Sequence, residues 1–171
     1  MSNSSWKKLL AEKLKSPVKK TRPRLAVVGI GAELNGDDAV GVIVARKLQP
    51  LVREQPDVFV LEGGSVPESM IGPLRKFSAE LVILIDATDL RDEPGTIRWI
   101  DQNQICGSSF STHSLPLTLL CQFLEKEIRC EVLILGVQPE SIEFGQPLST
   151  SCKRAASQIT TAISKLLCSP Q

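Results

Sequence analysis

The feature that most constrains the fold of this 171-residue chain is an alternation of short apolar runs with helical patterns from residue 24 onward. The apolar runs are rich in Val, Ile and Leu, which is typical of strands buried on both faces. Between the runs, apolar residues recur every three or four positions, which is typical of helices that cover a sheet. We therefore predict a single α/β domain in which a twisted, mostly parallel sheet of about five strands is sandwiched between helices.

The same patterns predict the individual elements. Residues 96–100 follow the turn Glu93-Pro94-Gly95, and apolar and polar residues alternate there more than in the other runs. We therefore predict an edge strand, with an antiparallel orientation as one option. Ser149 and Thr150 are candidate caps for the last helix. Strands are expected at residues 25–30, 58–61, 81–85, 96–100 and 132–137, and helices over 39–48, up to Phe77, from about 114 to 128, and from about 150 to 167.

The N-terminal segment differs in composition from the rest of the chain. Residues 1–24 contain eight Lys or Arg residues and only one acidic residue, Glu12. Trp6, Leu10 and Leu14 have helical spacing, and a basic linker follows them. We predict that residues 1–23 form a basic amphipathic leader and linker and that residues 24–169 form the α/β domain. The leader is interpreted as a surface helix packed on the domain or a partly ordered tail, with a docking arm for an acidic partner or a membrane-surface helix as alternatives.

Composition narrows the function classes. Hydrophobic residues make up 42% and charged residues 23% of the chain, which is ordinary for a globular protein. Five cysteines form no CxxC pair, so we expect reduced thiols and a cytoplasmic location. No apolar run approaches the roughly 20 residues of a spanning helix, so no stable membrane insertion is expected. The domain carries no cluster of cations, so nucleic acid is not an expected partner. The oligomeric state cannot be inferred.

Two acidic residues follow the first predicted strand. Gly29 and Gly31 suggest a dinucleotide-binding loop, but the third glycine of that fingerprint would fall at Leu34. Asp37 and Asp38 would also place negative charge at the helix N-terminus that binds phosphate in such folds. We interpret Asp37 as a possible N-cap of the helix, which leaves Asp38 to face the crevice.

Two further residues lie at strand-to-helix junctions. Asp86 follows the most apolar strand, and His113, the single histidine, precedes a predicted helix. Ligands collect at the carboxyl ends of strands in such sheets, so Asp38, Asp86 and His113 are candidates for one site. Two carboxylate oxygens and one imidazole nitrogen are suitable ligands for a divalent transition metal, and they leave coordination positions of the metal open for reaction. The simpler alternatives are an Asx-turn at Asp86 and an exposed loop position for His113.

The order of these motifs resembles that of the hydrogenase maturation endopeptidases, and within them the branch that processes hydrogenase 3-type [NiFe] enzymes. The resemblance covers roughly residues 24–165. This chain departs from the family pattern at Ala32, because the family commonly has asparagine after the second glycine. The motifs that carry it are Gly29-Ile30-Gly31 with Gly36-Asp37-Asp38-Ala39-Val40-Gly41, Glu62-Gly63-Gly64-Ser65-Val66-Pro67-Glu68, Ile85-Asp86-Ala87-Thr88-Asp89, Ser111-Thr112-His113-Ser114-Leu115-Pro116-Leu117 and Leu135-Gly136-Val137-Gln138-Pro139-Glu140.

The resemblance implies a protease that removes the C-terminal extension of a [NiFe]-hydrogenase large-subunit precursor after nickel insertion. It implies that Asp38, Asp86 and His113 bind the metal and carry out catalysis, in a family sometimes classed with aspartic peptidases. Because no fourth protein ligand is evident, we expect the nickel to be supplied by the precursor, and no nucleotide to be used. Either the metal or one of the aspartates would activate the water.

A second glycine-rich segment is a candidate for contact with the substrate. Gly63, Gly64 and Ser65 would let a substrate backbone approach closely, although turn formation alone explains them equally well. Two alternatives to the endopeptidase remain at this point. One is a phosphoacceptor module of the response-regulator type, which would need a lysine near Val137 that this chain lacks. The other is a Rossmann-like binding domain.

Overall fold

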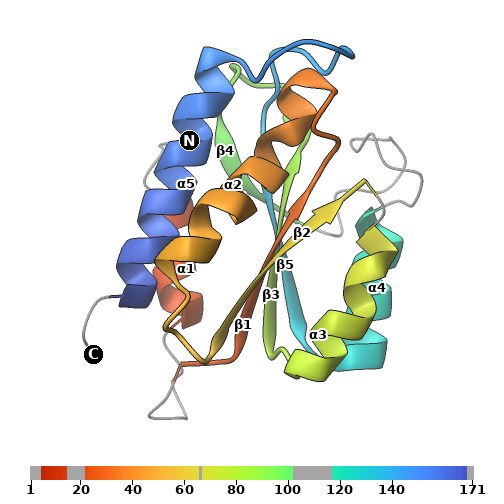
Figure 1. Ribbon diagram of the computed structural model, residues 1–171, viewed down its shortest axis with the longest axis vertical. Coiled ribbons are helices and arrows are strands. Elements are labelled where there is room, and N and C mark those ends of the chain that lie inside the picture. The colour runs from red at the N-terminus through yellow and green to blue at the C-terminus, as the bar shows by residue number, and fades with distance from the viewer. Residues whose placement is uncertain (1–4, 15–21, 66, 102–116, 169–171) are drawn as a thin grey trace.

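The computed structural model describes residues 5–14, 22–65, 67–101 and 117–168. It contains a five-stranded sheet in the order β2-β1-β3-β5-β4 (Figure 1). β1, β2, β3 and β5 are parallel, and β4 pairs with β5 in the antiparallel direction at the edge. The predicted fold class and the edge position of the fourth strand are therefore confirmed. The strands are β1 (Leu25–Ile30), β2 (Val58–Gly64), β3 (Leu81–Ala87), β4 (Ile97–Ile100) and β5 (Glu131–Val137).

Helices cover both faces of the sheet. α1 (Ser5–Leu14), α2 (Val40–Leu48) and α5 (Thr150–Cys168) lie on one face. α3 (Ile71–Phe77) and α4 (Leu117–Ile128) lie on the other (Figure 1). The described ranges also contain three short 3-10 turns: η1 (Gly36–Ala39), η2 (Gln49–Leu51) and η3 (Pro67–Met70).

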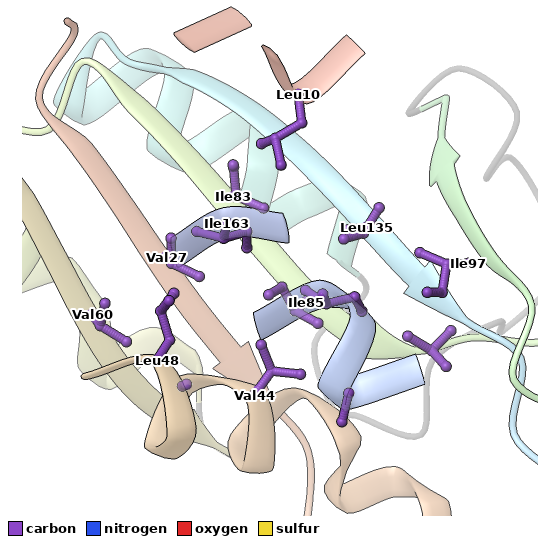
Figure 2. Packing of buried hydrophobic residues seen from close by; sticks show 14 of the residues in the cluster. Leu10, Val27, Val44, Leu48, Val60, Ile83, Ile85, Ile97, Leu135 and Ile163 are labelled. Atoms are coloured by element: carbon purple, nitrogen blue, oxygen red, sulfur yellow. The ribbon is translucent and has the colours of Figure 1, made fainter. Parts of the chain in front are cut away.

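Each central strand contributes to two cores, because successive side chains point to opposite faces. Val27, Ile83 and Leu135 pack with Ile163 of α5 in the first core (Figure 2). Their neighbours along the strands, such as Val28 and Leu84, pack against α3 and α4 in the second. This double burial explains why the strands read as continuous apolar runs.

The N-terminal helix belongs to the first core. Trp6 and Leu10 are buried, and α1 contacts α5 and β4. The indole nitrogen of Trp99 donates a hydrogen bond to the carbonyl oxygen of Trp6 over 2.9 Å. Residues 5–14 therefore form a helix packed on the domain, and the division of the chain into a leader and a domain at residue 24 stays a prediction.

Two strands extend beyond their predicted ends. β2 continues to Gly64 and β3 continues to Ala87, because their backbones keep pairing after the apolar pattern has stopped. The start of α5 agrees with the prediction, since the Ser149 hydroxyl oxygen accepts a hydrogen bond from the backbone N–H of Cys152 over 3.1 Å. Ser149 therefore caps this helix.

Four of the five cysteines lie within the described ranges and are free thiols, as predicted. Cys121, Cys130 and Cys152 are buried, and Cys168 is exposed. Burial raises the pKa of the Cys121 and Cys152 thiols to about 12 in each case. None of the helices in the described ranges is long and apolar enough to cross a membrane.

Candidate active site

The strand order reverses between β1 and β3. The chain runs from β1 outward to β2 on one side and then returns to β3 on the other, and such a reversal opens a crevice at the carboxyl ends of the two central strands. Asp38 lies in η1, soon after β1, and is 1% exposed. Asp86 lies near the end of β3, opposite Gly136 of β5, and is fully buried. The structure therefore brings both predicted carboxylates to the same end of the sheet.

Close backbone contacts between glycines position this end of the fold. A Cβ atom on Gly29 would lie 2.0 Å from the carbonyl oxygen of Gly41, and one on Gly41 would lie 2.1 Å from that of Ile85. The start of α2 can therefore lie directly on β1 and β3 only because neither glycine has a side chain. Gly31 has φ +137°, and a Cβ there would lie 1.8 Å from the carbonyl oxygen of Asp38. These contacts hold the start of α2 next to Ile85, the residue that precedes Asp86, and hold the backbone of η1 next to Gly31.

The Asp38 carboxylate is oriented by the loop after β1. Its Oδ2 atom accepts a hydrogen bond from the backbone N–H of Ala32 over 2.7 Å. Ala32 is the position where the chain departs from the family motif. Because the backbone makes this bond, an alanine side chain at this position does not prevent it.

Asp37 has a different role from the one predicted for it. It does not cap a helix, but accepts hydrogen bonds from the backbone N–H groups of Ser149 (2.6 Å), Glu140 (2.8 Å) and Ser141 (3.5 Å). The prediction was wrong because the side chain is buried and faces the loop between β5 and α5, over 100 residues away in sequence. Burial raises its pKa, but the hydrogen bonds from Ser149 and Glu140 outweigh burial, so the pKa of Asp37 lies below its ordinary value.

The third predicted ligand, His113, lies outside the described residues, so its place in the site stays a prediction. Within the described ranges, no group of three His, Cys, Asp or Glu residues could hold a metal ion. A metal bound by Asp38 and Asp86 would need a further ligand, and His113 stays the predicted one.

The predicted substrate segment lies at the end of β2. Gly63 is buried, and a Cβ there would lie 2.9 Å from the Cγ1 atom of Val28. The carbonyl oxygen of Gly64 accepts a hydrogen bond from the N–H of Gly31 over 3.0 Å, and Gly64 has φ +61°. Ser65 is exposed. The segment is thus bonded to the loop that leads to Asp38, and its contact with a substrate stays a prediction.

Sequence reasoning missed one charged cluster beside the site. Arg46 of α2 donates to Glu33 in the loop after β1 (2.5 and 2.9 Å) and to Glu62 of β2 (2.5 and 3.3 Å). Its hydrogen bonds and charge hold the pKa of Glu33 below its ordinary value. Arg46 is 13 positions from Glu33 and 16 positions from Glu62, so no local sequence pattern could have paired them.

Comparisons with known proteins decide the family. A family model described as hydrogenase maturation protease matches residues 42–166. The chain belongs to this family. A putative hydrogenase maturation protease of Methanocaldococcus jannaschii is 32% identical to it over 167 residues, which cover 94% of this chain and 95% of that protein. The hydrogenase 3 maturation protease of Escherichia coli K12 is 33% identical over 131 residues, 76% of this chain and 82% of that protein.

Solved structures of hydrogenase maturation proteases share the fold. The crystal structure of a [NiFe] hydrogenase maturation protease HycI from Thermococcus kodakarensis KOD1 has a TM-score of 0.82 and 31% identity, covering 93% of this chain and 98% of that one. The family supports a peptidase activity for this protease. It does not favour the phosphoacceptor and dinucleotide-binding alternatives.

Proposed function

We propose that this protease is an endopeptidase that removes the C-terminal extension of a [NiFe]-hydrogenase large-subunit precursor after nickel has been inserted. The observation that carries the proposal is the burial of Asp38 and Asp86 at the carboxyl ends of neighbouring strands, in a chain of this family. Buried carboxylates are normally paired or coordinate metals, so two of them at one crevice favour a cation as the recognised feature.

The donor set fits nickel that the substrate carries. Two carboxylates and the imidazole of His113 are ligands that divalent transition metals accept. Three protein ligands leave positions for the precursor's own ligands. Asp38 and Asp86 would therefore bind the precursor only when its metal is present, which would link cleavage to completed nickel insertion.

The reaction is hydrolysis of one peptide bond. The site residues would bring the scissile carbonyl next to the metal and orient the attacking water. A water activated by the metal or by one of the two aspartates would attack the carbonyl carbon, and a protonated group would return a proton to the leaving amine. Gly63, Gly64 and Ser65 would contact the backbone of the bound segment.

The proposal is tested with purified precursor, with and without nickel, followed by the gel shift and the intact mass of the products. We expect trimming of the nickel-loaded precursor only. Asp86→Asn and His113→Ala should each lower the cleavage rate about 100-fold or more, because each removes a predicted ligand.

Asp89→Asn is the matched control, since Asp89 is an exposed carboxylate three residues after Asp86. It should cleave at the wild-type rate. Circular dichroism melting of each variant separates loss of the site from loss of the fold. Normal trimming by folded Asp86→Asn or His113→Ala protein would exclude the assigned residues, and trimming without nickel would exclude metal recognition.

A further inference from the structure

Two loops beside the candidate site expose large apolar side chains. Leu34, in the loop after β1, is 65% exposed, and Ile142 and Phe144, in the loop between β5 and α5, are 42% and 79% exposed. We call these three residues the loop face. The other large apolar side chains exposed within the described ranges are distributed over η2, α4 and α5: Leu51, Leu119, Phe123 and Leu166.

The two loops are held together as one unit. The N–H of Gly145 donates to the carbonyl oxygen of Leu34 over 2.7 Å, and the N–H of Asp37 donates to that of Ser141 over 2.8 Å. The Asp37 carboxylate adds the bonds to the second loop described above. A Cβ on Gly36 would lie 2.6 Å from the Ser141 carbonyl oxygen, so the backbones touch. The loop face is therefore preformed.

The loop face lies on the two loops that hold the segment carrying Asp38. Leu34 is four residues before Asp38, and Asp37, which holds the second loop, is the residue directly before Asp38. A polypeptide whose reacting bond lies at Asp38 and Asp86 would therefore extend over these loops. Exposed apolar residues gathered next to a site mark an interaction surface.

The charges around the loop face indicate the chemistry of the partner. Glu140 and Glu143 are exposed, and neither forms an ion pair with any residue that the structure describes. Glu33 and Glu62 share the single guanidinium of Arg46. The two loops themselves, residues 31–35 and 138–149, contain three acidic residues and no basic one, so they are complementary to an apolar segment with basic neighbours.

We propose that the loop face binds an apolar segment of the substrate polypeptide that is flanked by Lys or Arg, away from the bond that is cut. This inference rests on the proposed function, because it takes the precursor as the occupant. The loop face supplies binding of the precursor, and Asp38 and Asp86 supply recognition of its metal. Affinity and cleavage therefore depend on different residues.

The first test replaces Ile142 and Phe144 together by serine and measures kcat and KM with nickel-loaded precursor. Leu51→Ser is the matched control, because Leu51 is 52% exposed on η2 at the opposite end of the sheet. We expect KM to rise about tenfold in the double variant with kcat within twofold of the wild type, since only binding common to ground and transition states is removed. A KM within twofold of the wild type, or an equal rise in Leu51→Ser, would overturn the proposal.

The second test reverses the charges with Glu140→Lys and Glu143→Lys. In the wild type, KM should rise with ionic strength, because salt screens the attraction between an acidic surface and a basic segment. In the charge-reversed variant, KM should be higher at low salt and should fall as salt is added. The same salt dependence in both proteins would show that the partner segment is not basic and would overturn that part of the inference.

Binding is also measured without cleavage, so that the two proposals can fail separately. Fluorescently labelled, nickel-free precursor, which the proposed function leaves uncut, is titrated into the wild type and into the Ile142→Ser, Phe144→Ser double variant. We expect about tenfold weaker binding in the double variant. Equal binding, or no binding in either protein, overturns the loop face. Tight binding that depends on the loop face, combined with no cleavage of nickel-loaded precursor by the wild type, overturns the endopeptidase and leaves the loop face standing.

Discussion

The two ends of the sheet hold their buried charges in different ways. At the amino end, Arg22 donates two hydrogen bonds to the Asp57 carboxylate (2.6 and 2.8 Å) and one to the carbonyl oxygen of Leu167 in α5 (2.8 Å). At the carboxyl end, the Asp37 carboxylate is held by backbone N–H groups, and among the described residues no cation pairs with it. Asp57 at the amino end is held by a cation, whereas Asp37 at the carboxyl end is held by neutral donors.

This difference in how the two carboxylates are held matches the roles of the two ends: the amino end joins chain segments, and the carboxyl end carries the candidate site. A guanidinium at the amino end lowers the pKa of Asp57 and joins the chain before β1, the chain before β2 and the end of α5. A fixed cation at the carboxyl end would repel the metal ion that we propose binds at Asp38 and Asp86. Neutral N–H groups stabilise Asp37 without adding positive charge there, and the guanidinium of Arg46 is shared by two carboxylates.

The largest effect on stability is expected from Asp37→Ala. The change leaves the N–H groups of Ser149, Glu140 and Ser141 without their acceptor, and each buried donor left unsatisfied is costly. We expect a loss of about 3 kcal/mol in the free energy of unfolding, measured by urea titration. Asp37→Asn keeps one acceptor oxygen and should lose less. A loss equal to or smaller than that of Arg22→Ala would break the comparison.

Asp37 should also contribute a pH dependence of known sign. Its pKa is lower in the folded state than in the unfolded chain, so its stabilisation is fully present above the unfolded value. That stabilisation is lost as the pH falls below about 4 and through the folded pKa. The difference in unfolding free energy between wild type and Asp37→Asn should therefore shrink in acid. A difference that grows as the pH falls would contradict the assigned bonds.

Arg22→Ala tests the amino end. The guanidinium is largely buried, so its removal leaves Asp57 without its partner and should reduce the free energy of unfolding by about 2 kcal/mol. Cleavage activity per folded molecule should stay unchanged, because the change is at the end of the sheet away from the site. Arg53→Ala is the matched control: Arg53 is exposed near η2 and forms no ion pair with the described residues, so neither stability nor activity should change.

Arg46→Ala should have the smallest effect on stability. Its side chain is 46% exposed, and exposed ion pairs are weakened by water and salt. The urea midpoint should barely move, but KM should change a few-fold, since the loop that carries Glu33 and Leu34 is no longer tied to β2. Arg46→Lys, which cannot bridge both carboxylates with a planar fork, should resemble Arg46→Ala more than the wild type. A midpoint shift as large as that of Arg22→Ala would remove the distinction between the two arginines.

The elements that the sequence predicted are those whose signal is local. Strands buried on both faces are apolar throughout. Asp86 could be found because it follows such a run directly, and Asp38 because it opens the helical pattern after another. The residues that bond to Asp37 could not be found from the sequence, because Glu140 and Ser149 are 103 and 112 positions away from it. The hydrogen bonds of Arg22 and Arg46 were missed for the same reason. Pairings of this kind depend on how loops meet after folding, which no periodicity encodes.

The contact between α1 and β4 has a practical consequence for spectroscopy. The chain contains two tryptophans and no tyrosine, and those two residues, Trp6 and Trp99, are joined by the hydrogen bond that fixes the N-terminal helix. Intrinsic fluorescence of this protein therefore reports on the docking of that helix and not on the catalytic crevice. A red shift in emission at mild denaturant, before the circular dichroism signal changes, would mark the detachment of α1 as a separate step.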